Sequence, residues 1–199
     1  MPEDLALQLP YAKEVSELLG FKVVEKQGFE GDDILGTLAA RCMESGDECF
    51  IYTGDKDALQ LVNDWVTVYL PHTKPGGTET IVYDKDRVAA DFGGLTPRQL
   101  IDVKALQGDN SDNIPGVPGV GPKTAISLIA KYGTLENLYD TIEHTPEKGK
   151  LQDKLMEGKN SAFFSQTLGT ICTDAPIGCN LSDLYPGVPD RDVVLEDLT

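Results

Sequence analysis

The chain has 199 residues, 40% of them hydrophobic, and a formal net charge of −16 at pH 7. That apolar content can bury a core in one domain or two small ones. No apolar run reaches membrane-spanning length, so we expect no membrane partner. The charge argues against a simple nucleic-acid-binding protein, because phosphate binding usually needs a basic surface. Either the acids gather where divalent cations bind, or a basic part lies outside this chain.

Cysteine and histidine suggest no metal or catalytic site of their own. The four cysteines show no C-x-x-C spacing and no neighbouring histidine, which disfavours zinc. We therefore expect reduced thiols in a cytoplasmic protein. The two histidines are too few and too isolated for a histidine-based mechanism. These residues are Cys42, Cys49, Cys172 and Cys179, and His72 and His144.

The first half of the chain alternates helix and strand patterns. Helices are expected over residues 4–19, 30–45 and 58–61, and strands over 21–25, 49–53, 66–70 and 79–83. This alternation is typical of an α/β layer with a mainly parallel sheet. Ligands of such sheets bind at the carboxyl ends of strands, where Asp55 and Asp57 follow a buried strand.

After about Thr96 the pattern is helical only. Helices are expected over residues 97–107, 123–131, 135–142, 148–156 and 161–171. The tail from Asp174, rich in proline and acids, is expected to be a loop or a frayed end. We therefore predict an α/β unit over residues 1–106 and a helical unit over residues 107–199.

Three groups of carboxylates stand at the ends of these elements, and each has an ordinary structural interpretation. Acids in the first turn of a helix, as at 30–33, commonly cap it. Gly-Asp-Lys-Asp after a strand is most often a turn, and 108–113 is compatible with a loop of Asx turns. A calcium hand is excluded there, because no glutamate follows at the twelfth position. An aspartyl-nucleophile phosphatase is disfavoured by the mid-chain position of 55–57 and by the Ala-Leu that follows.

Taken together, the three groups favour a metal site. Hard cations such as Mg²⁺ and Mn²⁺ prefer oxygen ligands, and two of them about 4 Å apart can promote phosphodiester hydrolysis. A shared metal cluster also explains how a fold tolerates so many like charges. The candidate ligands are Glu30, Asp32, Asp33, Asp55, Asp57, Asp109 and Asp112, of which the last four are the candidate catalytic residues.

A glycine-punctuated hairpin follows the third acidic group directly. Its glycines permit close approach of backbone to phosphate, and the next helix N-terminus offers free N–H groups and the positive end of a dipole. The alternative is a plain Gly/Pro turn. We expect this helix–hairpin–helix to bind DNA through Gly116, Gly119, Val120, Gly121, Lys123 and Thr124.

These motifs resemble the 5′-nuclease domain of bacterial DNA polymerase I and, more broadly, the flap endonuclease family. The matching segments are 28–33, 53–61, 105–125, 131–136 and 170–174. The resemblance implies a PIN-like parallel sheet core with a helix–hairpin–helix (H3TH) subdomain. It further implies a 5′-3′ exonuclease or flap endonuclease with a two-metal Mg²⁺ or Mn²⁺ site, acting in replication and repair.

By the same resemblance, residues 30, 32, 33, 55 and 57 serve one metal and residues 109 and 112 the other. The implied substrate is duplex DNA with a 5′ flap or 5′ end, or an RNA primer, and a DNA polymerase is an implied partner or fusion. We expect a monomer, cytoplasmic and associated with the bacterial nucleoid.

The chain also departs from the family. Residues 1–5 match an internal helix start, so we expect a fragment whose first strand, leading ligand aspartates and basic helical arch lie outside it. Gly31 stands where the family usually carries alanine. We accordingly expect the chain alone to bind the metals weakly and to cleave DNA poorly or not at all. The alternative is a catalytically inactive DNA-binding remnant that uses only its hairpin.

Overall fold

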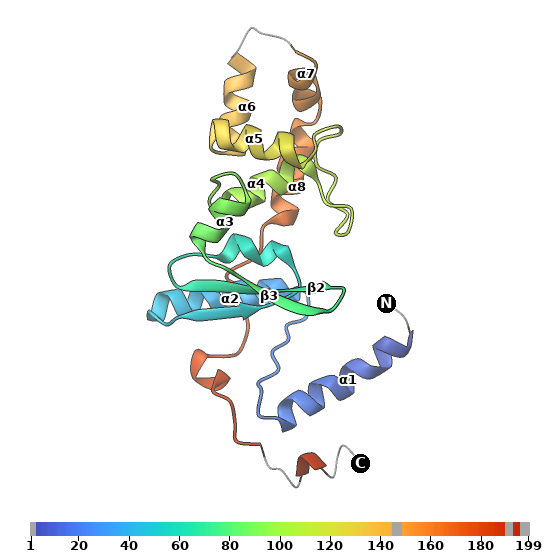
Figure 1. The fold of residues 1–199 in the computed structure, drawn as a ribbon, viewed down its shortest axis with the longest axis vertical. Coiled ribbons are helices and arrows are strands. Elements are labelled where there is room, and N and C mark those ends of the chain that lie inside the picture. The colour runs from blue at the N-terminus through green and yellow to red at the C-terminus, as the bar shows by residue number, and fades with distance from the viewer. Residues whose placement is uncertain (1–2, 145–148, 190–192, 196–199) are drawn as a thin grey trace.

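A computed structural model describes residues 3–144, 149–189 and 193–195. The molecule is elongated, with a helical part at one end and a small sheet beside helix α2 in the middle (Figure 1). Helix α1 (Glu3–Leu18) stands apart from the sheet at the opposite end. Among the residues that the structure describes, no helix has the length and apolar character that crossing a membrane requires.

The middle part is an α/β layer, which confirms the predicted fold class. Strands β1 and β2 are parallel, with Cys49 opposite Val66, whereas β2 and β3 are antiparallel, with Lys74 opposite Gly77. The sheet is therefore mixed, not mainly parallel, because a turn as short as 74–77 can join only antiparallel strands. The elements are α2 (Gly31–Ser45), β1 (Cys49–Tyr52), the 3-10 helix η1 (Lys56–Leu61), β2 (Val66–Lys74), β3 (Gly77–Tyr83) and α3 (Lys85–Asp91).

Strand β2 supplies the centre of this layer's core. Its alternating residues Val66, Val68 and Leu70 are buried, as expected for a strand with one face against helices. They pack with Leu59 of η1 and Val88 of α3. Full burial of each such side chain stabilises the fold by about 1.5–3 kcal/mol. Packing of η1 into this core fixes the backbone that carries Asp57.

Two local predictions were wrong. Residues 21–25 form neither helix nor strand, since an extended segment becomes a strand only where a neighbour pairs with it. Helix α3 was missed, although its N-cap gives a clear signal. The Asp84 side chain accepts a hydrogen bond from the Arg87 backbone N–H at 2.7 Å, the pattern of a capped helix start.

The remaining helices agree with the predictions to within two residues at most ends. They are α4 (Gln99–Gln107), α5 (Pro122–Tyr132), α6 (Leu135–His144), α7 (Lys150–Glu157) and α8 (Lys159–Gly169). Lys148, the predicted start of one helix, lies outside the described residues. The tail holds one further 3-10 turn, η2 (Leu181–Leu184). The boundary between residues 106 and 107 stays a prediction.

The helical part has its own core and is tied to the α/β layer by polar contacts. Leu106, Ile129 and Leu138 lie in one buried cluster. At the junction the Gln60 side chain donates to the Gly169 carbonyl and accepts from the Ile171 N–H, each at 3.0 Å. This pair of hydrogen bonds fixes η1, which carries Asp57, against the end of α8.

Two glycines bring the chain back on itself between α4 and the hairpin. Gly108 and Gly116 have φ of 74° and 61°, in the left-handed region that favours glycine. A Cβ on Gly116 would lie 2.3 Å from the Gly108 nitrogen. The Gly116 N–H also donates to the buried Ser165 hydroxyl at 2.9 Å. The loop between the two glycines is therefore held closed by their close backbone contact.

We expect Gly116→Ala to lower the free energy of unfolding by at least about 2 kcal/mol, since it combines a strained φ with a backbone clash. Urea denaturation measures this. Gly121→Ala is the matched control, five residues beyond Gly116 at the N-cap of α5. Gly121 has a φ of −96° and no heavy atom within 4 Å of its Cβ position, so the expected loss is below about 1 kcal/mol. Equal losses in the two variants would contradict this account of the loop.

Candidate metal centre and phosphate-binding hairpin

The three acidic groups converge in space. One cleft of about 140 Å³ is lined by acids from each group: Glu30, Asp32 and Asp33 from the start of α2, Asp57 from η1, and Asp112. Carboxylate oxygens of Asp57, Asp109 and Asp112 all lie within 4.8 Å of one another. Asp55, at the start of η1, is close enough to perturb Asp32 electrostatically. Residues up to 82 positions apart in the sequence thus share one site.

Asp32 experiences the repulsion of this cluster most directly. Partial burial, followed by the charges of Asp55 and Asp57, raises the pKa of its carboxyl to about 6. Burial likewise raises the pKa of Asp57, although the hydrogen bond from Lys104 acts in the opposite direction. For both carboxyls burial is the largest cause and the charges of neighbouring acids add to it, a combined cost that a bound cation would relieve.

Glu30 and Asp33 have structural duties at the start of α2. They form a capping box, in which the Asp33 carboxylate accepts from the Glu30 N–H at 3.0 Å and Glu30 accepts from the Asp33 N–H. The other Asp33 oxygen accepts from the Cys172 N–H at 2.9 Å. Asp33 therefore fixes the segment after α8 against α2. Of this group, Asp32 has the carboxylate least engaged by backbone groups.

The loop that carries Asp109 and Asp112 is rigidly closed. Asp109 and Ile114 exchange two backbone hydrogen bonds, each of 2.8 Å. The Asp109 carboxylate also accepts from the N–H and hydroxyl of Ser111, and these bonds lower its pKa. Asn113 takes a φ of 56°, which asparagine tolerates better than most residues. The Asx turn expected at this loop is present, and it holds Asp109 in place.

Lys104 lies at the centre of the cluster and was missed in the sequence. Its Nζ is 2.7 Å from Asp112 and 3.3 Å from Asp109, and it also donates to Asp57. The side chain is only 9% exposed. Burial by itself lowers the pKa of Lys104, but hydrogen bonds to Asp112 and Asp57 outweigh it and raise the pKa overall. A lysine flanked by the apolar residues Val103, Ala105 and Leu106 was the available signal.

The donor set suits a hard divalent cation. Oxygens on opposite sides of Mg²⁺ lie about 4.2 Å apart, given metal–oxygen distances of about 2.1 Å. The 4.8 Å span of the three aspartate oxygens is compatible with such a site after small side-chain adjustments. No histidine or cysteine is among these ligands, which favours Mg²⁺, Mn²⁺ or Ca²⁺ over softer metals.

The hairpin places its predicted contact residues in two environments. Gly119, Gly121 and Lys123 are exposed, whereas Gly116 and Val120 are buried, so the latter two shape the hairpin from within. Helix α5 begins at Pro122, where the first N–H groups have no intrahelical partner. The side chain of Thr124 is half-buried. An anion would therefore meet Gly121, Lys123 and the start of α5.

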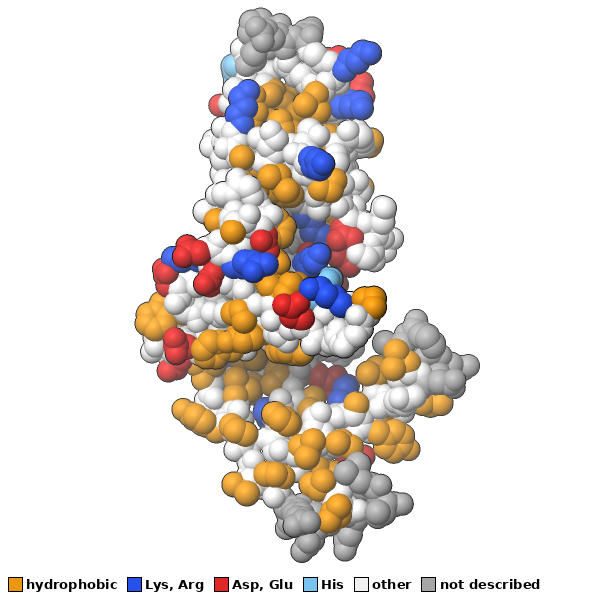
Figure 2. All heavy atoms as spheres, viewed as in Figure 1, with side chains coloured by type: hydrophobic (Ala, Val, Ile, Leu, Met, Phe, Trp, Pro, Cys, Tyr) orange, Lys and Arg blue, Asp and Glu red, His pale blue; other side chains and the backbone are white. Residues whose placement is uncertain are grey.

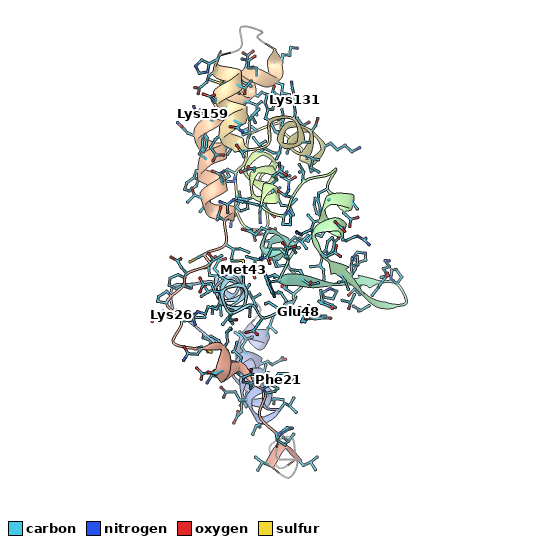
Figure 3. All side chains as sticks on the ribbon, turned by 90° about the vertical axis from the view of Figure 1, so that its left-hand side faces the viewer. Phe21, Lys26, Met43, Glu48, Lys131 and Lys159 are labelled. Atoms are coloured by element: carbon cyan, nitrogen blue, oxygen red, sulfur yellow. The ribbon has the colours of Figure 1, made fainter. Side chains whose placement is uncertain are left out.

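Positive side chains are distributed over the helical part. On the face drawn in Figure 2, Lys and Arg side chains lie at the helical end, whereas around the sheet acids and basic side chains are mixed. In Figure 3, Lys131 and Lys159 lie in the helical part, far from Phe21 beside α1. Residues 113–132, which span the hairpin and α5, carry two lysines and no acidic residue. The strong negative charge of the chain is therefore absent from this segment.

Comparison with known proteins gives two adjacent family matches. Residues 1–93 match a family described as "5′-3′ exonuclease, N-terminal resolvase-like domain", and residues 95–192 match "5′-3′ exonuclease, C-terminal SAM fold". DNA polymerase I of Bacillus subtilis is 42% identical over 194 residues, which are 97% of this chain and 22% of that protein. DNA polymerase I of Chloroflexus aurantiacus is 40% identical over 194 residues, which are 98% of this chain and 20% of that protein. The chain thus spans about a fifth of the length of these relatives.

Solved structures show the same fold at lower identity. The T5 5′-exonuclease with bound divalent zinc ions aligns with a TM-score of 0.72 and 24% identity, over 87% of this chain and 63% of that one. The catalytic core of Rad2 in complex with DNA substrate aligns with a TM-score of 0.65 and 19% identity, over 100% of this chain and 65% of that one. The arrangement of the sheet and the helical part is therefore a known fold.

We expect the burial of Asp32 and its repulsion by neighbouring acids to appear together as a pH dependence of stability in EDTA. Its pKa is about 6 in the folded chain, against the ordinary aspartate value of 3.8 in an unfolded chain, so between these pH values the folded chain binds more protons. Rising pH therefore destabilises the wild type relative to Asp32→Asn. The variant should be more stable by about 1 kcal/mol at pH 7, a value reduced for the solvent exposure of Asp32.

Urea unfolding of both proteins over this pH range measures the difference. Asp64→Asn, which alters an exposed acid paired with Lys85, is the control and should show no such gain at pH 7. Parallel pH profiles for wild type and Asp32→Asn would contradict the electrostatic account.

Proposed function

Because this chain belongs to the 5′-3′ exonuclease family, we propose that it is the metal-dependent nuclease part of a 5′-3′ exonuclease or flap endonuclease. The observation that carries the proposal is the cluster of Asp57, Asp109 and Asp112, whose oxygens lie within 4.8 Å of one another. A hairpin built to approach phosphates follows this cluster directly. The combination suits hydrolysis of a nucleic-acid backbone.

The carboxylates have distinct parts in this proposal. Asp57, Asp109 and Asp112 would hold one Mg²⁺ or Mn²⁺, and Asp32, Asp55 and Glu30 would contribute to a second. Such cations lower the pKa of a coordinated water and stabilise charge on phosphate oxygens. Asp33 acts mainly through Cys172 and the α2 start, where it keeps Asp32 facing the cleft. The chain's own contribution is to fix these oxygens before substrate arrives.

The hairpin would hold the duplex by its backbone. Free N–H groups at the start of α5 and the Lys123 ammonium suit phosphate, and neither distinguishes one base from another. The chain has a net charge of −16, but residues 113–132 carry no acidic side chain that would repel phosphate, which supports this role. The proposed substrate is DNA with a 5′ flap or 5′ end, or an RNA primer, in replication and repair. The proposal includes a monomer in the cytoplasm, with a DNA polymerase fused or acting alongside.

A DNA-binding remnant without catalysis is the less favoured alternative. It leaves unexplained why three separate segments bring carboxylates together, at an electrostatic cost visible in the raised pKa values of Asp32 and Asp57. Hairpin binding alone requires none of these acids.

We expect slow, Mn²⁺-dependent cleavage of a fluorescent 5′-flap duplex under single-turnover conditions with the chain in excess. Asp109→Asn should reduce the rate at least about 100-fold, since it removes a charged ligand from the reaction centre. Duplex binding measured in Ca²⁺ should change less than twofold. Binding without cleavage in Mg²⁺, Mn²⁺ or Co²⁺ would favour the remnant. Cleavage equal in Asp109→Asn and wild type would remove Asp109 from the mechanism.

Lys123→Ala should weaken duplex binding about equally for unrelated DNA sequences and lower the slope of log affinity against log salt by about 1. Fluorescence anisotropy from 50 to 200 mM salt, without metal, measures both. Lys85→Ala, whose ammonium pairs with Asp64 on the α/β layer, is the control and should leave the slope unchanged. An unchanged slope in Lys123→Ala would place the phosphate contact elsewhere.

A further inference from the structure

Lys104 differs from every other cationic side chain in the described part of the molecule. The other lysine and arginine ion pairs there join one cation to one carboxylate, and their cations are more than a third exposed. Lys104 contacts three carboxylates with a side chain that is 9% exposed. A pair such as Lys85–Asp64 contributes little because water screens it, whereas the contacts of Lys104 are shielded.

The position of Lys104 is imposed by the fold. It lies in the middle of α4, whose neighbours Val103, Ala105 and Leu106 are buried in or beside the helical core. Its stem runs past Gly169 of α8, where a Cβ would lie 3.5 Å from the lysine Cδ. Burial on both sides directs the ammonium into the acidic cluster. The lysine is therefore a fixed part of the site and not a mobile surface charge.

The same three aspartates contact the lysine and form the candidate cation site. Asp57 Oδ2 and Asp112 Oδ2 accept hydrogen bonds from Nζ, and Asp109 Oδ2 lies 3.3 Å from it. These are also the three residues whose ligand atoms lie within 4.8 Å of one another. A divalent cation bound there must share or displace the bonds of Lys104, and it meets a positive charge at short range.

We propose that Lys104 is a positioning residue that competes with the divalent cation for Asp57, Asp109 and Asp112. It holds the three carboxylates together against their mutual repulsion and thereby sets how tightly they bind a cation. This rests on the proposed function, since it concerns the same cluster. It adds a control of cation affinity by the chain's own ammonium group.

Direct Mn²⁺ binding to the 199-residue chain tests this, by electron paramagnetic resonance of free Mn²⁺ at pH 7.5. Lys104→Met removes the charge and keeps an unbranched stem, so it should bind Mn²⁺ at least fivefold more tightly than wild type. Its melting temperature in EDTA should fall, and Mn²⁺ should restore it. Lys104→Arg, which keeps the charge, and Lys85→Met, which breaks an exposed pair, should bind Mn²⁺ within twofold of wild type.

A second pair of variants covers the case in which Lys104→Met does not fold in EDTA. Asp112→Asn removes one of the repelling charges, and adding Lys104→Met to it should again tighten Mn²⁺ binding at least fivefold. Unchanged or weaker Mn²⁺ binding on loss of Lys104 in both backgrounds would overturn the proposal, as would absence of binding in every variant. Cation binding is the readout, so the result stands apart from whether the chain cleaves DNA.

Discussion

Mutual repulsion of carboxylates is the constraint around which this molecule is organised. Five acids from three segments line one cleft and Asp55 and Asp109 lie close by, and repulsion among these acids adds to the cost of burial that raises the pKa of Asp32. The fold meets that cost by placing each acid at the end of a rigid element and by burying one ammonium group, Lys104, among three of them. Neither the α/β layer nor the helical part contains the site alone, since Asp57 and Lys104 come from opposite sides of the junction.

Contacts at that junction are correspondingly specific. Gln60 links η1 to the end of α8, and Asp33 and Thr37 hold the following segment against α2 through backbone N–H groups. Gly36 permits this approach, because a Cβ there would lie 2.6 Å from Ile171. If the segments separated, these polar groups would lose their hydrogen bonds, and any group left buried without a partner would cost free energy. The junction is thus oriented by directional bonds as well as by apolar contacts such as those of Phe92 and Leu100.

The hairpin is positioned by the same close return of the chain. Gly108 and Gly116 touch through their backbones, which closes the acidic loop and starts the hairpin immediately beyond it. Because Val117 and Val120 are anchored in the helical core, the exposed Gly119 and Gly121 keep a fixed direction. A phosphate bound at the start of α5 would therefore have a defined position relative to the cleft, as the proposed cleavage of a nucleic-acid backbone requires.

Local patterns in the sequence predicted much of the secondary structure and indicated the family. Periodicity indicated the helices of the second half, and the acidic motifs and the glycine hairpin indicated the family and a candidate site, because these signals depend on neighbours within a few residues. Pairing partners lie outside such windows, so the absence of a strand at 21–25 and the antiparallel β3 required the folded sheet. The tertiary structure alone linked the Asp33 carboxylate to the Cys172 N–H, buried Val120, and brought Lys104 of α4 into contact with Asp57, 47 residues away. Charges interact through space, and only folding decides which of them meet.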